Sequence, residues 1–135
     1  MPLQQRAGAA VYNFLFAHET RYKGGLLSTH ADELAFVFHN VEYIGSQFAG
    51  PQTARMETEI FDSFMAFVRR GDPNNAAIPV WKPVTEAEHN CFVFSSAPGT
   101  RTAHDEELMR LVTKYGKNNT FAFLEKKRAP KGDTQ

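Results

Sequence analysis

Residues 28–38 read STHADELAFVF, a polar segment that passes directly into an apolar run. Ser28 or Thr29 can cap a helix, and the two acidic residues at positions 32 and 33 suit the positive end of its dipole. We therefore expect a short helix with an inward apolar stripe made of Leu34, Val37, Phe38 and Val41. His30 then lies in the loop that opens this helix.

A strand-like segment precedes this loop. Residues 11–16 (VYNFLF) are β-branched and aromatic, with no polar alternation after Asn13. This pattern is typical of a strand in a parallel sheet that is covered on both faces. The glycine pair at positions 24 and 25 marks the connecting loop. An imidazole in such a loop, at His30, can reach from a rigid scaffold toward a reacting group.

The best-defined helix is predicted from Thr53 to Arg70 and ends at the sequence GDPN of residues 71–74. Its expected apolar face consists of Ile60, Phe61, Phe64, Phe67 and Val68. Residues 78–83 (IPVWKP) then form a loop, in which Trp81 is expected to belong to the core. Thr85 and Glu88 have the spacing of a capping box and predict a single helical turn.

A second strand is predicted over residues 91–94 and a third helix over residues 102–115. The helix is expected to turn its apolar side inward, with the residues Leu108, Leu111, Val112 and Tyr115. Residues 120–124 fit either a short strand or an extended tail. A sheet of two strands cannot bury this many apolar side chains, so we expect that partner strands are missing.

The composition excludes several classes of function. Fifteen basic and fifteen acidic residues cancel, so no overall charge attracts nucleic acid or anionic lipid. Twelve phenylalanines argue against disorder. Cys91 is the only cysteine and fits a buried apolar position, which excludes an internal disulfide and a cysteine metal cluster.

No stretch of the sequence reaches transmembrane length. Arg6 and the apolar residues 7–17 imitate a weak signal peptide, but Asn13 interrupts them and no cleavage site follows. The compartment stays open, with a slight preference for the cytoplasm.

Four segments resemble the type-B carboxylesterases, the family of cholinesterases and para-nitrobenzyl esterases. They are residues 11–16 followed by His18, residues 28–38 around His30, residues 64–67 leading into GDPN at 71–74, and residues 78–83. The resemblance covers residues 9–96, and Val84 departs from it where the family often has an aromatic residue. It implies an α/β fold, the C-terminal portion of an α/β-hydrolase with two or three strands, three helices and long loops, incomplete by itself. Residues 1–125 would form this segment, and residues 126–135 a basic, solvated tail.

The resemblance also implies a mechanism. Ester hydrolysis in this family is implied to use a serine nucleophile, a histidine base and a buried carboxylate, and His30 stands at the position of the base. The sequence contains no Gly-x-Ser-x-Gly, the elbow that such a nucleophile needs. In this fold the nucleophile and the acid precede the histidine, so we expect a serine carboxylesterase segment that is inactive alone. Its partners would be an ester substrate, and a missing N-terminal half or a second copy paired at an exposed strand edge.

Other readings of the same residues remain open. Glu19 is a candidate for the orienting acid, while Asp32 and Glu33 fit carboxylates of a helix start better. His30 and Glu33 could share a helical face as metal ligands, but the other four histidines are scattered, so no metal or cofactor is expected. His30 could also be purely structural. The alternative functions are a non-catalytic binding module derived from the esterase fold and an independent small α+β domain with a ligand pocket.

Overall fold

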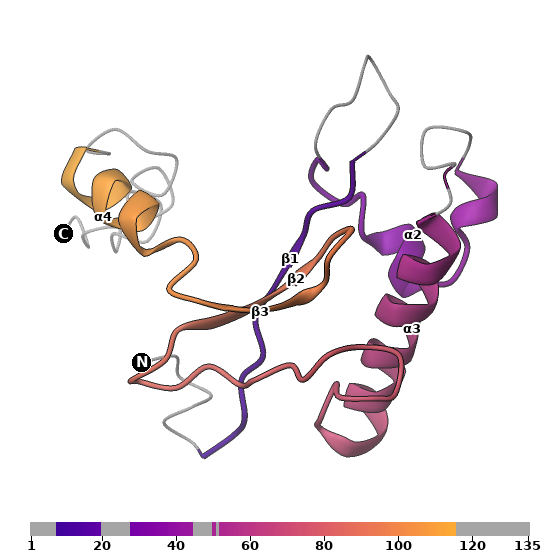
Figure 1. Cartoon of the computed structure of the whole chain (residues 1–135), viewed down its shortest axis with the longest axis horizontal. Helices are drawn as coiled ribbons and strands as arrows, with labels where there is room; N and C mark the ends of the chain where they lie inside the picture. The colour runs from indigo at the N-terminus through magenta and orange to yellow at the C-terminus, as the bar shows by residue number, and fades with distance from the viewer. Residues whose placement is uncertain (1–7, 20–27, 45–49, 51, 116–135) are drawn as a thin grey trace, which may run out of the picture. The chain divides into compact units, whose positions relative to one another are not determined.

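The computed structural model describes residues 8–19, 28–44, 50 and 52–115, which form three α-helices and one three-stranded sheet (Figure 1). The chain divides into two compact units, one up to His104 and one from Asp105. The first unit contains β1 (Phe14–Phe16), α2 (Leu34–Val37), the 3-10 helix η2 (Val41–Tyr43), α3 (Thr53–Arg70), β2 (Asn90–Phe94) and β3 (Gly99–Thr102). The second contains α4 (Glu106–Tyr115).

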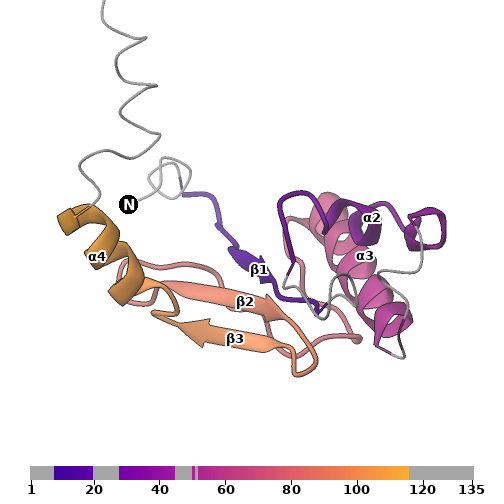
Figure 2. The same ribbon diagram turned by 90° about the horizontal axis from the view of Figure 1, so that it is seen from above.

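The sheet has the order β1-β2-β3 (Figure 2). β1 and β2 are parallel, with Phe14 beside Phe92, as the apolar sequence of the first strand predicts. β1 is shorter than expected, and Leu15 is 40% exposed, so the described residues do not cover both of its faces. β2 and β3 form an antiparallel pair that the sequence did not reveal, because GTRT carries no apolar alternation.

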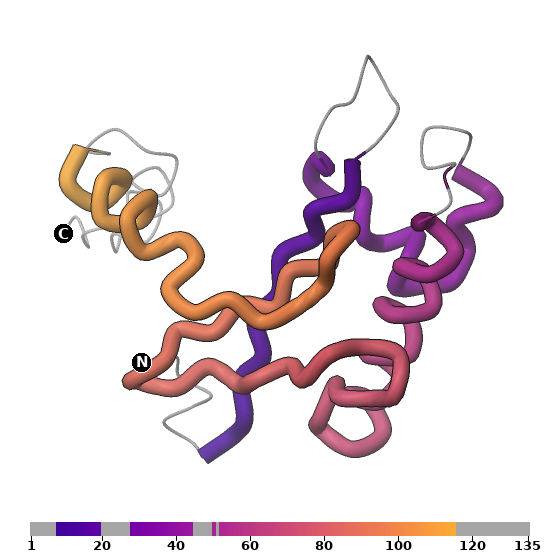
Figure 3. The backbone as a smooth tube through the Cα atoms, viewed as in Figure 1, coloured from indigo at the N-terminus to yellow at the C-terminus, as the bar shows by residue number. Residues whose placement is uncertain are grey.

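The core lies between the sheet and the helices α2 and α3. Its fully buried side chains are Phe36, Met56, Ile60, Phe92 and Phe94. The chain between α3 and β2 runs back across the sheet (Figure 3) and brings Trp81 into this core, as predicted. The Trp81 ring stacks on Phe92 at 5.1 Å. Cys91 is buried, also as predicted.

α3 has the predicted bounds. Gly71 adopts the left-handed conformation (φ 71°) and donates its N–H to the Phe67 carbonyl at 2.7 Å, which ends the helix. The predicted face was partly wrong. Ile60 is buried, but Phe67 and Val68 are exposed, and the helix buries small and polar residues that the pattern did not select: Thr53, Glu59, Ser63 and Ala66.

α2 also turns a different face inward than expected. Ala35 and Phe36 are buried, whereas Leu34 and Phe38 are 46% and 68% exposed. The helix has only four residues, so it does not present the long stripe that a helical period assumes. Val41 is buried as predicted, although it belongs to η2.

The second unit overturns one further expectation. α4 begins at Glu106 rather than at residue 102, and the four residues predicted to face inward are exposed: Leu108, Leu111, Val112 and Tyr115. Glu107 and Arg110 on its polar side form a bidentate ion pair. Residues 120–124 and 126–135, for which a strand and a tail were expected, lie outside the described residues.

The capping-box spacing at Thr85 gives a turn and no helix. The Thr85 hydroxyl accepts the Glu88 N–H at 2.9 Å, and the Thr85 N–H donates to the Glu88 carbonyl at 2.8 Å. None of the described helices is long and apolar enough to cross a bilayer.

Candidate functional site

His30 stands in a tight turn that a carboxylate closes. The Asp32 Oδ2 atom accepts the backbone N–H of Thr29 at 2.7 Å and its hydroxyl at 3.0 Å. Ala31 adopts a left-handed backbone (φ 73°), and its carbonyl accepts the N–H of Leu34 at the start of α2. Thr29 was a candidate cap, but its side chain binds Asp32 instead. The turn therefore fixes the backbone on both sides of His30.

Three contacts hold this turn and α2 against the end of β1. The Ser28 hydroxyl donates to the His18 carbonyl at 2.7 Å. The buried Phe36 ring of α2 packs against the ring of Phe16 at 4.9 Å and against that of His18 at 5.5 Å. His30 is thus held just beyond the carboxyl end of a parallel strand, where α/β sheets bind their ligands.

The imidazole of His30 is exposed, and none of the described residues forms a hydrogen bond with its ring. Glu19 is also exposed, so no buried carboxylate of the described chain orients the ring. Asp32 holds the turn, as a helix-start carboxylate would. Among the described residues, the hydroxyl and carboxyl groups of the turn therefore bind one another or the backbone and not the His30 ring.

The described histidines are not gathered in one cluster of metal-ligating side chains. The described part of the chain contains no group of three or more His, Cys, Asp or Glu side chains that could hold an ion. His18 is buried with its Nε2 3.5 Å from the Thr53 hydroxyl, and His39 pairs with Glu57 at 3.4 Å.

An arginine that sequence reasoning missed connects α3 to the end of β2. The Arg55 guanidinium pairs with the buried carboxylate of Glu59 and donates to the carbonyls of Ser95 (3.1 Å) and Ser96 (3.4 Å). Only the i,i+4 spacing of Arg55 and Glu59 could have indicated the pair in the sequence. With the contact between Thr53 and His18, the amino-terminal half of α3 therefore reaches the carboxyl ends of both parallel strands.

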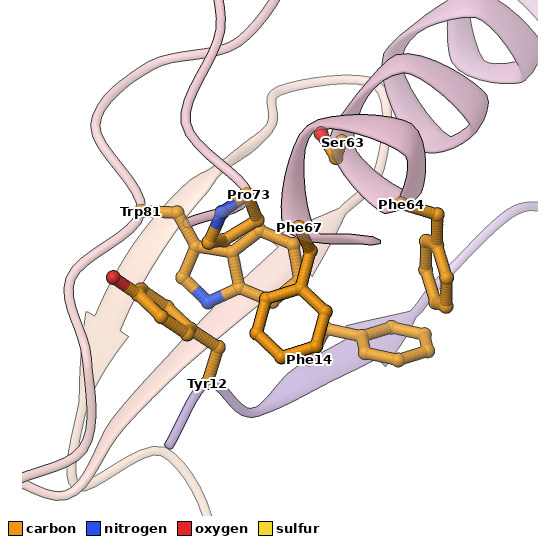
Figure 4. Close-up of a pocket in the computed structure, with 7 residues that line it drawn as sticks. All are labelled: Tyr12, Phe14, Ser63, Phe64, Phe67, Pro73 and Trp81. Atoms are coloured by element: carbon orange, nitrogen blue, oxygen red, sulfur yellow. The ribbon is translucent and has the colours of Figure 1, made fainter. Parts of the chain in front are cut away.

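A small pocket of about 130 Å³ lies between β1 and the carboxyl-terminal half of α3 (Figure 4). Its lining is almost entirely apolar and consists of Tyr12, Phe14, Ser63, Phe64, Phe67, Pro73 and Trp81. Burial and the neighbouring Asp72 carboxylate raise the pKa of Tyr12. Hydrogen bonds from the backbone and side chain of Asn74 lower the pKa of Asp72.

The comparisons with known proteins agree with this geometry. The model of the Carboxylesterase family matches residues 1–112, which extends the resemblance beyond Ser96 into α4. An esterase from the anaerobe Clostridium hathewayi that can hydrolyse aliphatic aromatic polyesters is 33% identical, with a TM-score of 0.74 over 81% of this chain. A carboxylesterase from Geobacillus stearothermophilus is 34% identical, with a TM-score of 0.67 over 78% of this chain.

A para-nitrobenzyl esterase shares the fold at 20% identity, with a TM-score of 0.68 over 78% of this chain. The comparison with curated proteins gave no match. The chain spans 22% of the length of each of the three solved esterases. Its strands and helices thus correspond to part of an α/β-hydrolase fold. The chain belongs to the carboxylesterase family.

Proposed function

We propose that this chain is the portion of a serine carboxylesterase that supplies the general base, His30. The observation that carries the proposal is the position of this exposed imidazole, on a turn closed by Asp32 at the carboxyl end of β1, in a carboxylesterase-family chain. A general base has to reach the proton that it removes, which a side chain packed in the core cannot do.

The lack of a hydrogen bond between the His30 ring and the described residues supports this role. In a Ser-His-Asp triad one ring nitrogen accepts the serine proton and the other donates to the acid, so both have to be available. The ring of His30 forms no hydrogen bond with the described residues, which leaves both nitrogens to groups from elsewhere. Asp32 uses its Oδ2 atom for the two bonds to Thr29, and its carboxylate forms no hydrogen bond with the His30 ring among the described residues.

The nucleophile and the acid would come from another segment of the protein. The sequence contains no Gly-x-Ser-x-Gly, and these groups precede the histidine in α/β-hydrolases. We therefore expect the chain alone to hydrolyse para-nitrophenyl acetate no faster than its His30→Ala variant. The completed protein would act on carboxylic esters.

A chimera tests the role of His30 directly. In the Clostridium hathewayi esterase, the segment that matches this chain is replaced by residues 1–112. We expect the chimera to hydrolyse para-nitrophenyl acetate and His30→Ala to lower kcat by roughly a million-fold, as removal of the base does in a comparable serine enzyme. Added imidazole should restore part of the lost rate.

His39→Asn is the matched control, because asparagine tolerates the left-handed backbone (φ 53°) of His39. It removes an exposed histidine outside the proposed site and should leave the rate unchanged. A folded chimera that is inactive with His30 in place would overturn the proposal and favour a non-catalytic binding module. A loss of rate in His39→Asn equal to that in His30→Ala would overturn the assignment of the base to His30.

A further inference from the structure

The aromatic pocket beside β1 has no polar group available for a ligand. The Ser63 hydroxyl donates to the Glu59 carbonyl and accepts from the Asn75 amide. The Trp81 indole N–H donates to the Asn13 carbonyl at 3.1 Å, and the Asp72 carboxylate lies near the Tyr12 hydroxyl. What remains exposed inside the pocket is ring and hydrocarbon surface, which suits an uncharged apolar group.

The volume of the pocket sets the size of that group. An engineered cavity of about 150 Å³ lined by apolar side chains stays dry and binds benzene. The pocket here has a volume of about 130 Å³ and is partly open to solvent, so it has room for one leucine or phenylalanine side chain that enters from outside.

The pocket is separate from the proposed catalytic end. It is lined by Tyr12 and Phe14 at the start of β1 and by Phe67 near the end of α3. His30 follows the opposite, carboxyl end of β1, which the amino-terminal half of α3 contacts through Thr53 and His18. An ester bound at His30 would therefore not enter this pocket.

The direction of the backbone of β1 indicates where an occupant would come from. The Asn13 carbonyl and the Ala17 N–H bind β2, at 2.9 and 2.8 Å. Alternate residues of a parallel strand direct their backbone groups to opposite edges, so those of Phe14 face the open edge of the described sheet. A further strand there would lie about 4.8 Å away and place a side chain beside Phe14, at the pocket.

We propose that the pocket is the socket for one apolar side chain, of leucine to phenylalanine size, from the strand that pairs with the open edge of β1 in the complete protein. This proposal rests on the proposed function in one respect only, namely that the chain is part of a larger esterase. The chain spans 22% of the length of the solved relatives. The lining, the volume and the open edge each fit such an occupant.

Binding of benzene to the 135-residue chain tests whether the pocket accepts an apolar group. Trp81 is the only tryptophan, so its fluorescence and its indole N–H resonance report on the pocket alone. We expect benzene to shift both signals and tetramethylammonium to shift neither. A shift by tetramethylammonium, or no shift by benzene, overturns the proposal, and neither result depends on His30.

Ser63 offers a matched pair of variants. Ser63→Ala removes the two hydrogen bonds of the hydroxyl without filling the pocket, and Ser63→Leu removes the same bonds and fills it. We expect Ser63→Ala to bind benzene like the parent chain and Ser63→Leu to bind it about ten-fold more weakly or worse. Equal benzene binding by the two variants contradicts the assigned pocket.

The melting temperatures of the same variants identify the occupant. In the 135-residue chain, Ser63→Leu should melt at or above Ser63→Ala, because it fills an empty space. In the chimera it should melt below Ser63→Ala, because the donated side chain already occupies that space. The same order in both proteins, or a chimera that does not fold with serine at position 63, overturns the proposal.

Discussion

Two aspartates close tight turns through charge-assisted hydrogen bonds, one beside the candidate base and one after the longest helix. Asp32 binds the backbone N–H and the hydroxyl of Thr29, and Asp72 binds the backbone and side-chain N–H groups of Asn74. The sequence predicted a carboxylate role at a helix start for Asp32 and a turn at GDPN. It could not show which donors each carboxylate binds, because those partners depend on the folded backbone.

Asp72→Ala should lower the free energy of unfolding at neutral pH by about 1–2 kcal/mol, because two N–H groups of Asn74 lose their acceptor. Hydrogen bonds from Asn74 lower the pKa of Asp72 below its ordinary value of 3.8. The stabilisation is therefore complete above 3.8 and is lost as the pH falls through the pKa of the folded state. Urea unfolding at several pH values should show the parent and the variant converging in acid.

Asp62→Ala is the control for this series, since Asp62 is exposed on α3. Its unfolding free energy should differ little from that of the parent at every pH. A constant difference between Asp72→Ala and the parent down to strongly acidic pH would contradict the role of the carboxylate.

Among the elements, the existence and the bounds of α3 could be read from the sequence, but the face that it buries could not. A glycine, two basic residues before it and a helical period are local signals, and they placed the end of the helix at Arg70. Burial of Ser63 and Glu59 depends on Asn75 and Arg55, whose positions follow from the tertiary fold. Similarly, the helical period of α4 indicated which residues share an apolar face, but not whether another element covers that face.

Gly71→Ala should destabilise the first unit by about 1–2 kcal/mol, the cost of a left-handed backbone in a residue with a Cβ atom. Apart from residue 71 and its two neighbours, no atom lies within 4 Å of the added methyl group, so the cost comes from the local backbone and not from packing against other residues. Thermal or urea unfolding measures it.

Gly99→Ala serves as the comparison, because Gly99 also has open space around it but is not among the glycines with a positive φ. It should be neutral or slightly stabilising. Equal destabilisation by the two variants would refute the conformational explanation.

For the molecule as a whole, the parallel character of β1 and a partial α/β-hydrolase fold were predictable, because the apolar sequence of β1 and four family-like segments in the right order indicate them. The pairing of β1 with β2 was not, since it joins segments far apart in the sequence. The same contrast between sequence and structure applies to the proposed site. His30 stands out in the sequence, whereas its support by Ser28 and Phe36 is visible only in the structure.

The open edge of β1 predicts association of the isolated chain, because unpaired backbone groups on an edge strand pair with other strands. We expect the average mass in sedimentation velocity to rise with protein concentration. Leu15→Lys, which places a charge on the exposed side of β1, should reduce this rise.

Val80→Lys is the control, because it replaces an equally apolar, exposed residue outside the strands. It should leave the mass distribution unchanged. A chain that remains monomeric at all concentrations would show that the edge of β1 is not available for pairing.

The parallel ladder between Phe14 and Phe92 has a consequence for biosynthesis. A ribosome extends the chain from its amino end, so β1 emerges long before the segment that hydrogen-bonds to it. Until translation has passed Phe94, the rings of Phe14 and Phe16 cannot pack beside those of Phe92 and Phe94. Closing a loop of this length costs conformational entropy, whereas the contacts within α3 are local. We therefore expect α3 to form before β1 pairs with β2.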